Sequence, residues 1–393
     1  MGVHEVTESG RPRRPLREAW QEELATAYRD PRAAWAALRP GQPVPARLDE
    51  VARSLPVRIP RSYARLIDPH DPADPLARMV LPDPAELVPS PHLVSDPLGE
   101  EPHTVSPRLV HRYRDRALLL VTLRCASYCR HCTRRRAVGR GGLISREELA
   151  AAVRYLREHP EIRDLLVSGG DPLLLPDRPL GRLLETVRQV QSLDLVRIGS
   201  RIPAVLPARV TPALVRILAR VAPLFLNTHF NHPRELTAEA VAACGRLVDA
   251  GIPLANQTVL LAGVNDSLDT LEALCRGLLK ARVRPYYLLQ SDLVQGVEHL
   301  RTPLARGIEL IRGLQTRVSG MALPVFVVDG PFGTGKIPIF PDNVVAREAG
   351  CTLLRSPDGG IVSYSDPLPP PDPLPPAGAP PPPPPGPKPG EAR

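Results

Sequence analysis

The stretch ALLLVTLRCASYCRHC, residues 117–132, joins an apolar run of strand length to three closely spaced cysteines. From Ala117 onward one pattern repeats: a short apolar run, a turn with polar residues, and a segment with helical periodicity. The further apolar runs are DLLVSGG from 164, LVRIGS from 195, LFLNTHF from 224, PLANQTVLL from 253, VRPYYLLQ from 283 and LPVFVVDG from 323. From 164 to 283 they recur about every 30 residues, close to the length of one βα unit, and the series predicts six or seven parallel units.

Polar residues gather at the end of every predicted strand. The cysteines follow the first strand, SGGDP the second, GSR the third and THFNHP the fourth; NQ lies in the fifth, QSD follows the sixth, and DGPFGTGK the seventh. A doubly wound sheet binds its ligand at one switch point, whereas a barrel places chemistry at the carboxyl ends of all its strands. The expected fold class is therefore α/β, with a partial barrel of the (β/α)6 type.

The 393 residues divide by composition into four expected parts. Residues 1–104 contain two amphipathic helical stretches, separated by Pro31, and then a Pro- and Asp-rich stretch, which together predict an N-terminal helical and irregular cap. Residues 105–322 form the βα core, and residues 323–366 a C-terminal segment with the last strand. Residues 367–393 hold 15 of the 50 prolines and predict a disordered tail, because consecutive prolines favour the extended polyproline II conformation.

Composition also indicates where the protein is located and which partners are expected. No run of about 18 apolar residues occurs, and the N-terminal stretch MGVHEVTESGRPRR lacks the apolar core of a signal peptide, so a cytoplasmic protein is expected. The net charge is +8, but the arginines are scattered among acids except at Arg134, Arg135 and Arg136. Nucleic acid is therefore not the expected partner, and a membrane is not expected either, although nucleic-acid binding through these arginines stays an open alternative.

Lysine is scarce, and its few positions are informative. The chain has 47 arginines and three lysines, Lys280, Lys336 and Lys388. A lysine amine can lose its proton and form a Schiff base, which a guanidinium cannot. Lys388 falls in the tail and Lys280 ends an amphipathic helix, which leaves Lys336 in the glycine-rich GPFGTGKIPIF as the candidate. The spacing G-x4-G-K also fits a phosphate-binding loop, but Ile337 and Pro338 follow where a hydroxyl residue and a helix are required.

Cys125, Cys129 and Cys132 have the spacing C-x3-C-x2-C. Three thiolates on one short loop can hold three irons of a cubane cluster and leave the fourth iron open to a ligand. The alternative is a zinc site, but structural zinc requires four protein ligands and there is no second cysteine pair, although His131 could be a fourth ligand. The remaining cysteines, 244, 275 and 351, are expected to be ordinary core residues.

The segments CASYCRHCTRRR, SGGDPLL, RIGSRIPAVLP, LNTHFNHPRELT, NQTVLLAGVND, VRPYYLLQSD, RTPLARGIELI and FVVDGPFGTGKIPI resemble the lysine 2,3-aminomutase family of radical S-adenosylmethionine (SAM) enzymes. The resemblance covers roughly residues 105–366. It implies an isomerase with a [4Fe-4S] cluster, S-adenosylmethionine and pyridoxal 5′-phosphate. In this reaction a 5′-deoxyadenosyl radical removes hydrogen from C3 of the amino acid, and the amino group moves from C2 to C3.

The resemblance also implies roles for individual residues. It implies that the three cysteines bind the cluster and that Lys336 binds pyridoxal phosphate covalently. Contacts to adenosylmethionine are implied for Gly169, Gly170, Asp171 and Gln257. Contacts to the phosphate and ring of pyridoxal phosphate are implied for Arg112, Tyr113 and Arg116. For the substrate, Arg134 matches the residue that receives the carboxylate, and Asp292 and Asp329 match the pair that holds the distal ammonium. His131 and His229 are weaker candidates.

L-lysine is the expected substrate and β-lysine the product, with alternatives open. Two aspartates disfavour glutamate, but they could hold the guanidinium of arginine. Acting on another substrate, such as a lysine in a protein, is a further alternative. An electron donor such as flavodoxin or ferredoxin is an expected partner. The sequence departs from the family at two positions. Ser267 replaces a cysteine of the zinc site that joins subunits, so this zinc is expected to be absent, and whether the protein forms a homo-oligomer stays open. Leu289 replaces a tyrosine that is usual in the lysine enzymes.

Overall fold

The structure is a computed structural model that describes residues 18–348 and 351–365. It divides into two compact units, at residues 341 and 342, which are described separately below. The predicted tail at 367–393, with Lys388, and the N-terminal stretch 1–14 lie outside the described residues. In the described part of the chain, no helix is both long and apolar enough to cross a membrane.

The first unit is built on a mainly parallel sheet whose ten strands follow one another in chain order. The seven central strands are parallel and coincide with the seven predicted apolar runs, so this prediction is confirmed. The first two strands and the last one pair antiparallel at the two ends of the sheet. The strands are β1 (Thr104–Ser106), β2 (Leu109–Tyr113), β3 (Arg116–Thr122), β4 (Asp164–Gly169), β5 (Leu195–Ser200), β6 (Leu224–Thr228), β7 (Leu254–Leu260), β8 (Arg284–Gln290), β9 (Val325–Gly330) and β10 (Gly335–Pro338).

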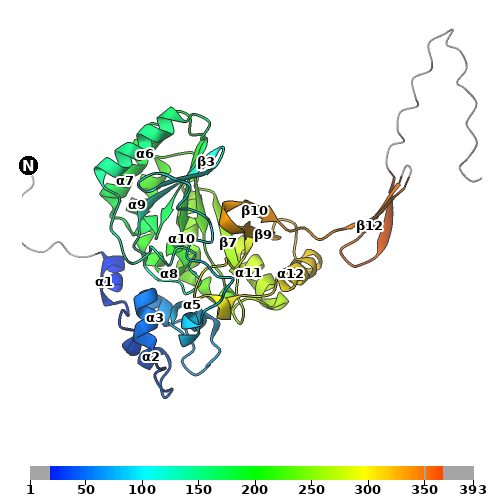
Figure 1. Ribbon diagram of the computed structural model, residues 1–393, viewed down its shortest axis with the longest axis horizontal. Helices are drawn as coiled ribbons and strands as arrows, with labels where there is room; N and C mark the ends of the chain where they lie inside the picture. Colours follow the sequence, from blue (N-terminus) through cyan, green and yellow to red (C-terminus); the bar gives the residue numbers. More distant parts are fainter. Residues whose placement is uncertain (1–17, 349–350, 366–393) are drawn as a thin grey trace, which may run out of the picture. The chain divides into compact units, whose positions relative to one another are not determined.

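A helix follows each parallel strand up to β8 (Figure 1). Side-chain caps start many of these helices: Ser145, Thr211, Thr237 and Ser267 each accept a hydrogen bond from a backbone N–H of the first turn. Neighbouring helices contact one another, as expected when all crossovers have the same hand and the helices form one layer. The helices of the βα units are α6 (Arg146–Glu158), α7 (Asp177–Arg188), α8 (Ile202–Val205), α9 (Pro212–Ala219), α10 (Ala238–Asp249), α11 (Leu268–Lys280) and α12 (Leu304–Arg317).

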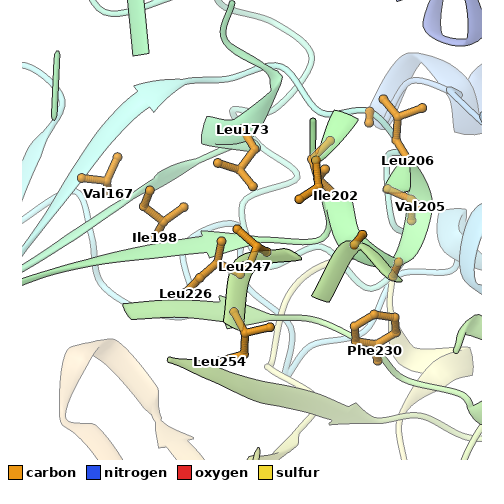
Figure 2. Close-up of a cluster of buried hydrophobic side chains, with 14 of the residues drawn as sticks. Val167, Leu173, Ile198, Ile202, Val205, Leu206, Leu226, Phe230, Leu247 and Leu254 are labelled. Atoms are coloured by element: carbon orange, nitrogen blue, oxygen red, sulfur yellow. The ribbon is translucent and has the colours of Figure 1, made fainter. Parts of the chain in front are cut away.

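Side chains alternate between the two faces of the sheet. Val167, Ile198 and Leu226 of successive strands are fully buried against the helix layer, together with Leu247 of α10 (Figure 2). The residues between them in sequence point to the other face, which is why that face carries the polar side chains described below. Cys244 and Cys275 are buried in α10 and α11, as the sequence predicted.

Residues 18–103 form the predicted helical and irregular segment. The helix break at Pro31 is confirmed, since Pro31 is the first residue of its helix and Asp30 caps it. The elements are α1 (Ala19–Thr26), α2 (Pro31–Leu38), α3 (Leu48–Ser54), α4 (Arg61–Ala64), α5 (Pro75–Val80) and the 3-10 helix η1 (Pro84–Leu87). Further single 3-10 turns are η2 (Pro172–Leu174), η3 (Pro207–Arg209), η4 (Pro233–Glu235), η5 (Glu298–Leu300) and η6 (Pro331–Gly333). Because α1 contacts η3 and α4 contacts α8, this segment packs beside the carboxyl end of β5.

A buried ion triad fastens this segment to the cysteine loop that follows β3. Glu86 of η1 accepts hydrogen bonds from Arg130 and Arg135, at 2.5 Å from an Nη2 atom of each. The side chains of Glu86 and Arg130 have no exposed surface. Arg130 also donates to the carbonyl of Leu55, so the triad connects three separate stretches of the chain.

The two ends of the sheet approach each other without strand pairing. Tyr113 of β2 accepts a hydrogen bond at 3.2 Å from the backbone N–H of Lys336 in β10. Gly335, with a φ of 99°, lets β10 pass close to the ring of Tyr113, because a Cβ there would lie 3.1 Å from a ring carbon. The sheet is therefore an open barrel bridged by side chains, which confirms the partial barrel.

The second unit contains, within the described residues, a three-stranded antiparallel sheet of β11 (Val344–Glu348), β12 (Cys351–Arg355) and β13 (Ile361–Ser365). Cys351 is half-buried and its sulfur lies 2.8 Å from the hydroxyl of Ser363. The expectation that Cys351 is a core residue is wrong, because this small sheet has no second layer among the described residues of its unit.

Candidate active site

Two adjoining hollows of about 220 and 240 Å³ lie on the cavity face of the sheet. The first is lined by residues at the β2 and β10 end of the sheet, and the second by the cysteine loop. The two hollows form one cavity because they share lining residues, among them Arg134, His229, Gln257, Asp329 and Lys336. All the site residues predicted from the sequence line one hollow or the other: Arg112, Tyr113, Arg116, Cys125, Cys129, Cys132, Arg134, Gly169, Gly170, Asp171, Gln257, Asp292, Asp329 and Lys336.

The three cysteines are free thiols on one wall of the cavity. Burial raises the pKa of Cys125 well above its usual value and that of Cys132 to about 11, so a thiolate here needs a neighbouring positive charge. Arg201, at the end of β5, donates a hydrogen bond of 2.7 Å from Nη1 to the sulfur of Cys129. Among the described residues, no three His, Cys, Asp or Glu side chains are arranged around a single metal ion. Cysteines of a cubane each bind a different iron, so the loop fits a cluster without such convergence.

The turn Gly169–Asp171 is packed directly against the start of the cysteine loop. The backbone N–H of Gly170 donates to the carbonyl of Thr122 at 2.6 Å, and that of Asp171 to the carbonyl of Arg124 at 2.9 Å. A Cβ on Gly170 would lie 2.4 Å from the carbonyl oxygen of Arg124, and one on Gly169, where φ is 124°, would lie 2.1 Å from that of Thr122. These glycines are therefore required for the approach of β4 to the cysteine loop.

Both oxygens of the Asp171 carboxylate accept hydrogen bonds from other groups of the protein. It accepts hydrogen bonds from the hydroxyl of Ser200 at 2.7 Å and from the backbone N–H groups of Arg201 and Leu173 at 2.8 and 3.1 Å. Burial raises its pKa to about 6, although these hydrogen bonds act in the opposite direction. Asp171 thus holds the ends of β4 and β5 together, and in doing so it positions Arg201 beside Cys129.

His229 and Gln257 lie where the two hollows join, and His131 lines the second hollow. Burial, and then the charge of Arg201, lower the pKa of His229 to about 4 and that of His131 well below its usual value. Asn231 donates to Nε2 of His131 at 3.2 Å, so the proton of this ring is on Nδ1, which has no partner among the described residues. Gln257 projects from β7 into both hollows. These groups can donate hydrogen bonds to a bound ligand without adding charge.

Lys336 forms an ion pair with Asp329, directly across the β9–β10 ladder. Asp329 is also approached by Nη2 of Arg112 at 3.6 Å. Asp292, after β8, accepts a hydrogen bond of 2.5 Å from the hydroxyl of Thr133. Burial, and then repulsion from Asp329, raise the pKa of Asp292 to about 6. The predicted pair of aspartates is therefore brought together, and the candidate lysine reaches Asp329 from the edge strand β10.

The end of the cavity away from the cysteines, which also contains Lys336, is basic and aromatic. The guanidinium carbons of Arg112 and Arg116 lie 4.6 and 4.5 Å from the ring centroid of Tyr113. Arg112 is oriented by a 2.7 Å hydrogen bond to the carbonyl of Leu98. Tyr286 and Tyr287 stack with centroids 3.8 Å apart on the same wall. Guanidinium groups and aromatic faces are suited to a phosphate joined to a flat ring.

Arg134 lies at the junction of the two hollows but already has a carboxylate partner. Its Nε and Nη2 atoms contact the side chain of Glu100 at 2.8 and 2.7 Å. Sequence reasoning missed Glu100, which sits in a Pro- and Asp-rich stretch without periodicity. It also gives no role to Arg201, although GSR follows a predicted strand. The only available signal for Arg201 was its position after β5.

The chain is similar to known proteins over most of its length. The radical SAM superfamily model matches residues 119–274, and the model described as lysine-2,3-aminomutase matches residues 308–370. The L-lysine 2,3-aminomutase of Clostridium subterminale is 46% identical to this chain, over 81% of it and 77% of that protein. That of Bacillus subtilis is 45% identical, with coverages of 80% and 67%. The glutamate 2,3-aminomutase of Clostridioides difficile is 39% identical, with coverages of 77% and 72%.

These matches confirm the resemblance drawn from the motifs. Radical SAM membership implies an iron-sulfur cluster and S-adenosylmethionine as cofactors, and the two relatives that are 46% identical to the chain are named L-lysine 2,3-aminomutases, which are isomerases. The chain belongs to the lysine 2,3-aminomutase family of radical S-adenosylmethionine enzymes.

Proposed function

We propose that this protein converts L-lysine to β-lysine with pyridoxal 5′-phosphate, a [4Fe-4S] cluster and S-adenosylmethionine. The observation that carries the proposal is the single cavity that joins three free cysteines at one end to Lys336 and a basic aromatic wall at the other. When bound, the cluster and adenosylmethionine supply one-electron radical chemistry, and pyridoxal phosphate supplies a ring that delocalises an unpaired electron.

At the cluster end, Cys125, Cys129 and Cys132 are the proposed iron ligands. Because Gly169 and Gly170 have no side chain, the β4 turn can pack against the cysteine loop. We propose that adenosylmethionine binds to the backbone of this turn, beside the cysteines. Asp171 contributes through the position of this turn, because its carboxylate is bound internally. Gln257 faces the space between the two hollows and is proposed to donate a hydrogen bond there.

At the opposite end, Lys336 is proposed to bond covalently to pyridoxal phosphate. Arg112 and Arg116 would bind the phosphate, because two planar guanidinium groups beside Tyr113 can donate several hydrogen bonds to its oxygens. The ammonium of Lys336 now neutralises Asp329. An amine bonded to the cofactor would no longer pair with Asp329 as a free ammonium, and the Asp329 carboxylate would then be available to a substrate cation.

The substrate would lie between Arg134 and the two aspartates. Glu100 holds Nε and Nη2 of Arg134, while no described residue bonds its Nη1, which can bind the substrate carboxylate. Asp292 and Asp329 would then bind the distal ammonium of lysine. A second carboxylate in the substrate would be repelled by this pair, which disfavours glutamate in spite of the glutamate enzyme among the relatives. Arginine is the competing cation.

The test is anaerobic reconstitution with iron, sulfide and pyridoxal phosphate. Borohydride treatment followed by peptide mass spectrometry is expected to find the cofactor on Lys336 in the wild type and to find none in Lys336→Ala. Incubation with adenosylmethionine, a reductant and lysine, arginine or glutamate is expected to yield a β-amino acid from lysine alone.

Three results would contradict the proposal. Labelling of Lys280 instead of Lys336 would remove the assigned lysine. A β-amino acid formed from arginine, and not from lysine, would reassign the substrate. Cleavage of adenosylmethionine without any β-amino acid would point to another substrate, such as a lysine in a protein.

A further inference from the structure

A cluster of arginines without carboxylate partners lies beside the cysteine loop. Arg58 donates a hydrogen bond of 2.7 Å from Nη1 to the backbone carbonyl of Cys125. Its guanidinium carbon lies 5.4 Å from the ring centroid of Tyr128, three residues farther along the loop. Arg58 is therefore joined to the backbone of a proposed cluster ligand through one hydrogen bond.

Two further arginines lie close to Arg58. Tyr28 and Ile59 exchange backbone hydrogen bonds of 2.9 and 3.0 Å, so Arg29 is held beside Arg58 on adjacent antiparallel segments. Arg124 directly precedes Cys125 and is exposed. Arg124 is placed near Arg58 because Arg58 bonds to the carbonyl of the next residue, Cys125. We call Arg29, Arg58 and Arg124 the basic patch.

The basic patch is extended by Arg53 and Arg140. Arg140 donates from Nη2 to the carbonyls of Arg53 and Ser54 at 3.0 and 2.9 Å, which holds these two exposed arginines together. Pro56, which lies between Arg53 and Arg58 in sequence, packs against Gly139, the residue before Arg140. Within residues 18–348 and 351–365, none of these five arginines has a carboxylate within 4.0 Å.

This lack of carboxylate partners contrasts with three other arginines of the same loop. Arg134, Arg135 and Arg136 all pair with acids, which include Glu86 and Glu100. The described arginines near the loop that lack a carboxylate partner are thus ones that do not line the cavity. A surface of this kind attracts an acidic partner and raises its rate of encounter.

The chemistry of the family defines what such a partner would do. A radical SAM cluster must receive an electron from outside the protein, and transfer requires the donor to come close to the cluster. We propose that the basic patch docks an acidic one-electron carrier protein, which reduces the cluster beside Cys125. The electron passes from the carrier to the cluster, so the carrier is oxidised by one electron and the cluster reduced by one.

This inference rests on the iron-sulfur cluster of the proposed function but not on amino migration. Its test therefore uses reduced flavodoxin as the carrier, and it measures binding and cluster reduction. A protein that forms no β-lysine can still pass it, so the two failures are distinguishable.

The informative variant is the double substitution Arg29→Glu with Arg124→Glu, because both side chains are exposed and neither lines the cavity. The matched control is Arg216→Glu with Arg220→Glu. These arginines are also exposed and without a described carboxylate partner, but they lie at the end of α9, toward the amino ends of the strands. Both variants change the net charge equally.

Flavodoxin is expected to bind the reconstituted wild type and the control with similar affinity, and to bind the patch variant roughly tenfold more weakly or worse. Wild-type binding is expected to weaken steeply as salt rises to about 0.3 M. The rate of cluster reduction by flavodoxin should fall in the patch variant, whereas reduction by the small reductant dithionite and the iron content should not change.

Several outcomes would overturn the proposal. These are unchanged flavodoxin binding in the patch variant, an equal loss in the control, or salt-independent binding by the wild type. Preferential binding of RNA or DNA over flavodoxin by the patch would assign it to a different partner. If the double variant does not fold, the exposed Arg53→Glu on α3 and the salt series on the wild type decide the question.

Discussion

Arg201 lies with its Nη1 atom 2.7 Å from the sulfur of Cys129 and with its Nη2 atom 2.6 Å from Oε1 of Glu235. Glu235 also accepts a hydrogen bond of 2.8 Å from the hydroxyl of Tyr63 in α4. A cysteine of the loop after β3 is thus connected through β5 and η4 to the N-terminal segment. An N–H donor at a ligating sulfur stabilises the more negative, reduced form of an iron-sulfur cluster.

The first prediction follows from this contact. Arg201→Gln is expected to lower the midpoint potential of the reconstituted cluster, and Arg201→Lys, which keeps the charge, should lower it less. The measurement is a redox titration followed by electron paramagnetic resonance, with iron content determined on the same samples. Arg163→Gln, which removes an exposed pair with Asp194, is the control and should leave the potential unchanged. An unchanged potential in Arg201→Gln with full iron content would contradict the prediction.

The second prediction concerns the glycines beside the cysteine loop. In Gly170→Ala the new Cβ would lie 2.4 Å from a backbone oxygen of Arg124, which cannot rotate away. We expect a loss of about 2–3 kcal/mol in the free energy of unfolding, as for other overpacked sites, and fewer irons bound per chain after reconstitution.

The control for Gly170→Ala is Gly142→Ala, because a Cβ on Gly142 meets no atom within 4 Å. This variant should change the free energy of unfolding by less than about 0.5 kcal/mol. Urea unfolding and iron analysis of both variants provide the measurements. Equal stability of the two variants would show that the turn can move away from the loop.

The sequence predicted the sheet because each parallel strand is a short apolar run, and it predicted Lys336 because arginine has replaced almost every other lysine. It could not predict partners that meet only through the fold. Glu86 and Glu100 lie in a stretch without helical or strand periodicity, yet one is paired with Arg130 and the other with Arg134. When 30 to 50 residues that include an irregular segment separate a carboxylate from its guanidinium partner, no periodicity in the sequence predicts that the two form an ion pair.

The third prediction tests the buried triad. Glu86→Ala would leave Arg130 and Arg135 buried without their carboxylate, and the cost is expected to be roughly 3–5 kcal/mol in the free energy of unfolding. Glu50→Ala removes an exposed partner of Arg47 and is expected to have little effect. Chemical denaturation measures both. A small effect of Glu86→Ala would mean that water reaches the two arginines and that the N-terminal segment is held in another way.

The fourth prediction concerns pH and the candidate substrate site. The pKa of Asp292 is about 6 because of burial and of its neighbour Asp329, and a lysine ammonium binds only the ionised carboxylate. The affinity for lysine should therefore fall as pH is lowered through about 6, by up to tenfold per pH unit. Spectral titration of the pyridoxal phosphate-loaded protein with lysine between about pH 5 and 7.5 measures this, since lysine itself does not titrate in that range.

The same group has the opposite effect on stability. Because its pKa is higher in the folded protein than the ordinary 3.8, the folded state binds more protons than the unfolded state between pH 3.8 and about 6. Stability should therefore decrease as pH rises through this window. Asp292→Asn removes that effect, and it is expected to raise the free energy of unfolding at pH 7 by roughly 2 kcal/mol while abolishing the pH dependence of lysine binding.

The matched control for Asp292→Asn is Asp194→Asn, an exposed carboxylate whose pKa is lowered by a hydrogen bond from Arg163. This variant should be no more stable than the wild type and should bind lysine normally. If Asp292→Asn is less stable than the wild type at pH 7, the carboxylate is better solvated or better paired than its burial indicates. If Asp292→Asn binds lysine with wild-type affinity, Asp329 alone binds the substrate cation. The repulsion between Asp292 and Asp329 would then have no role in lysine binding.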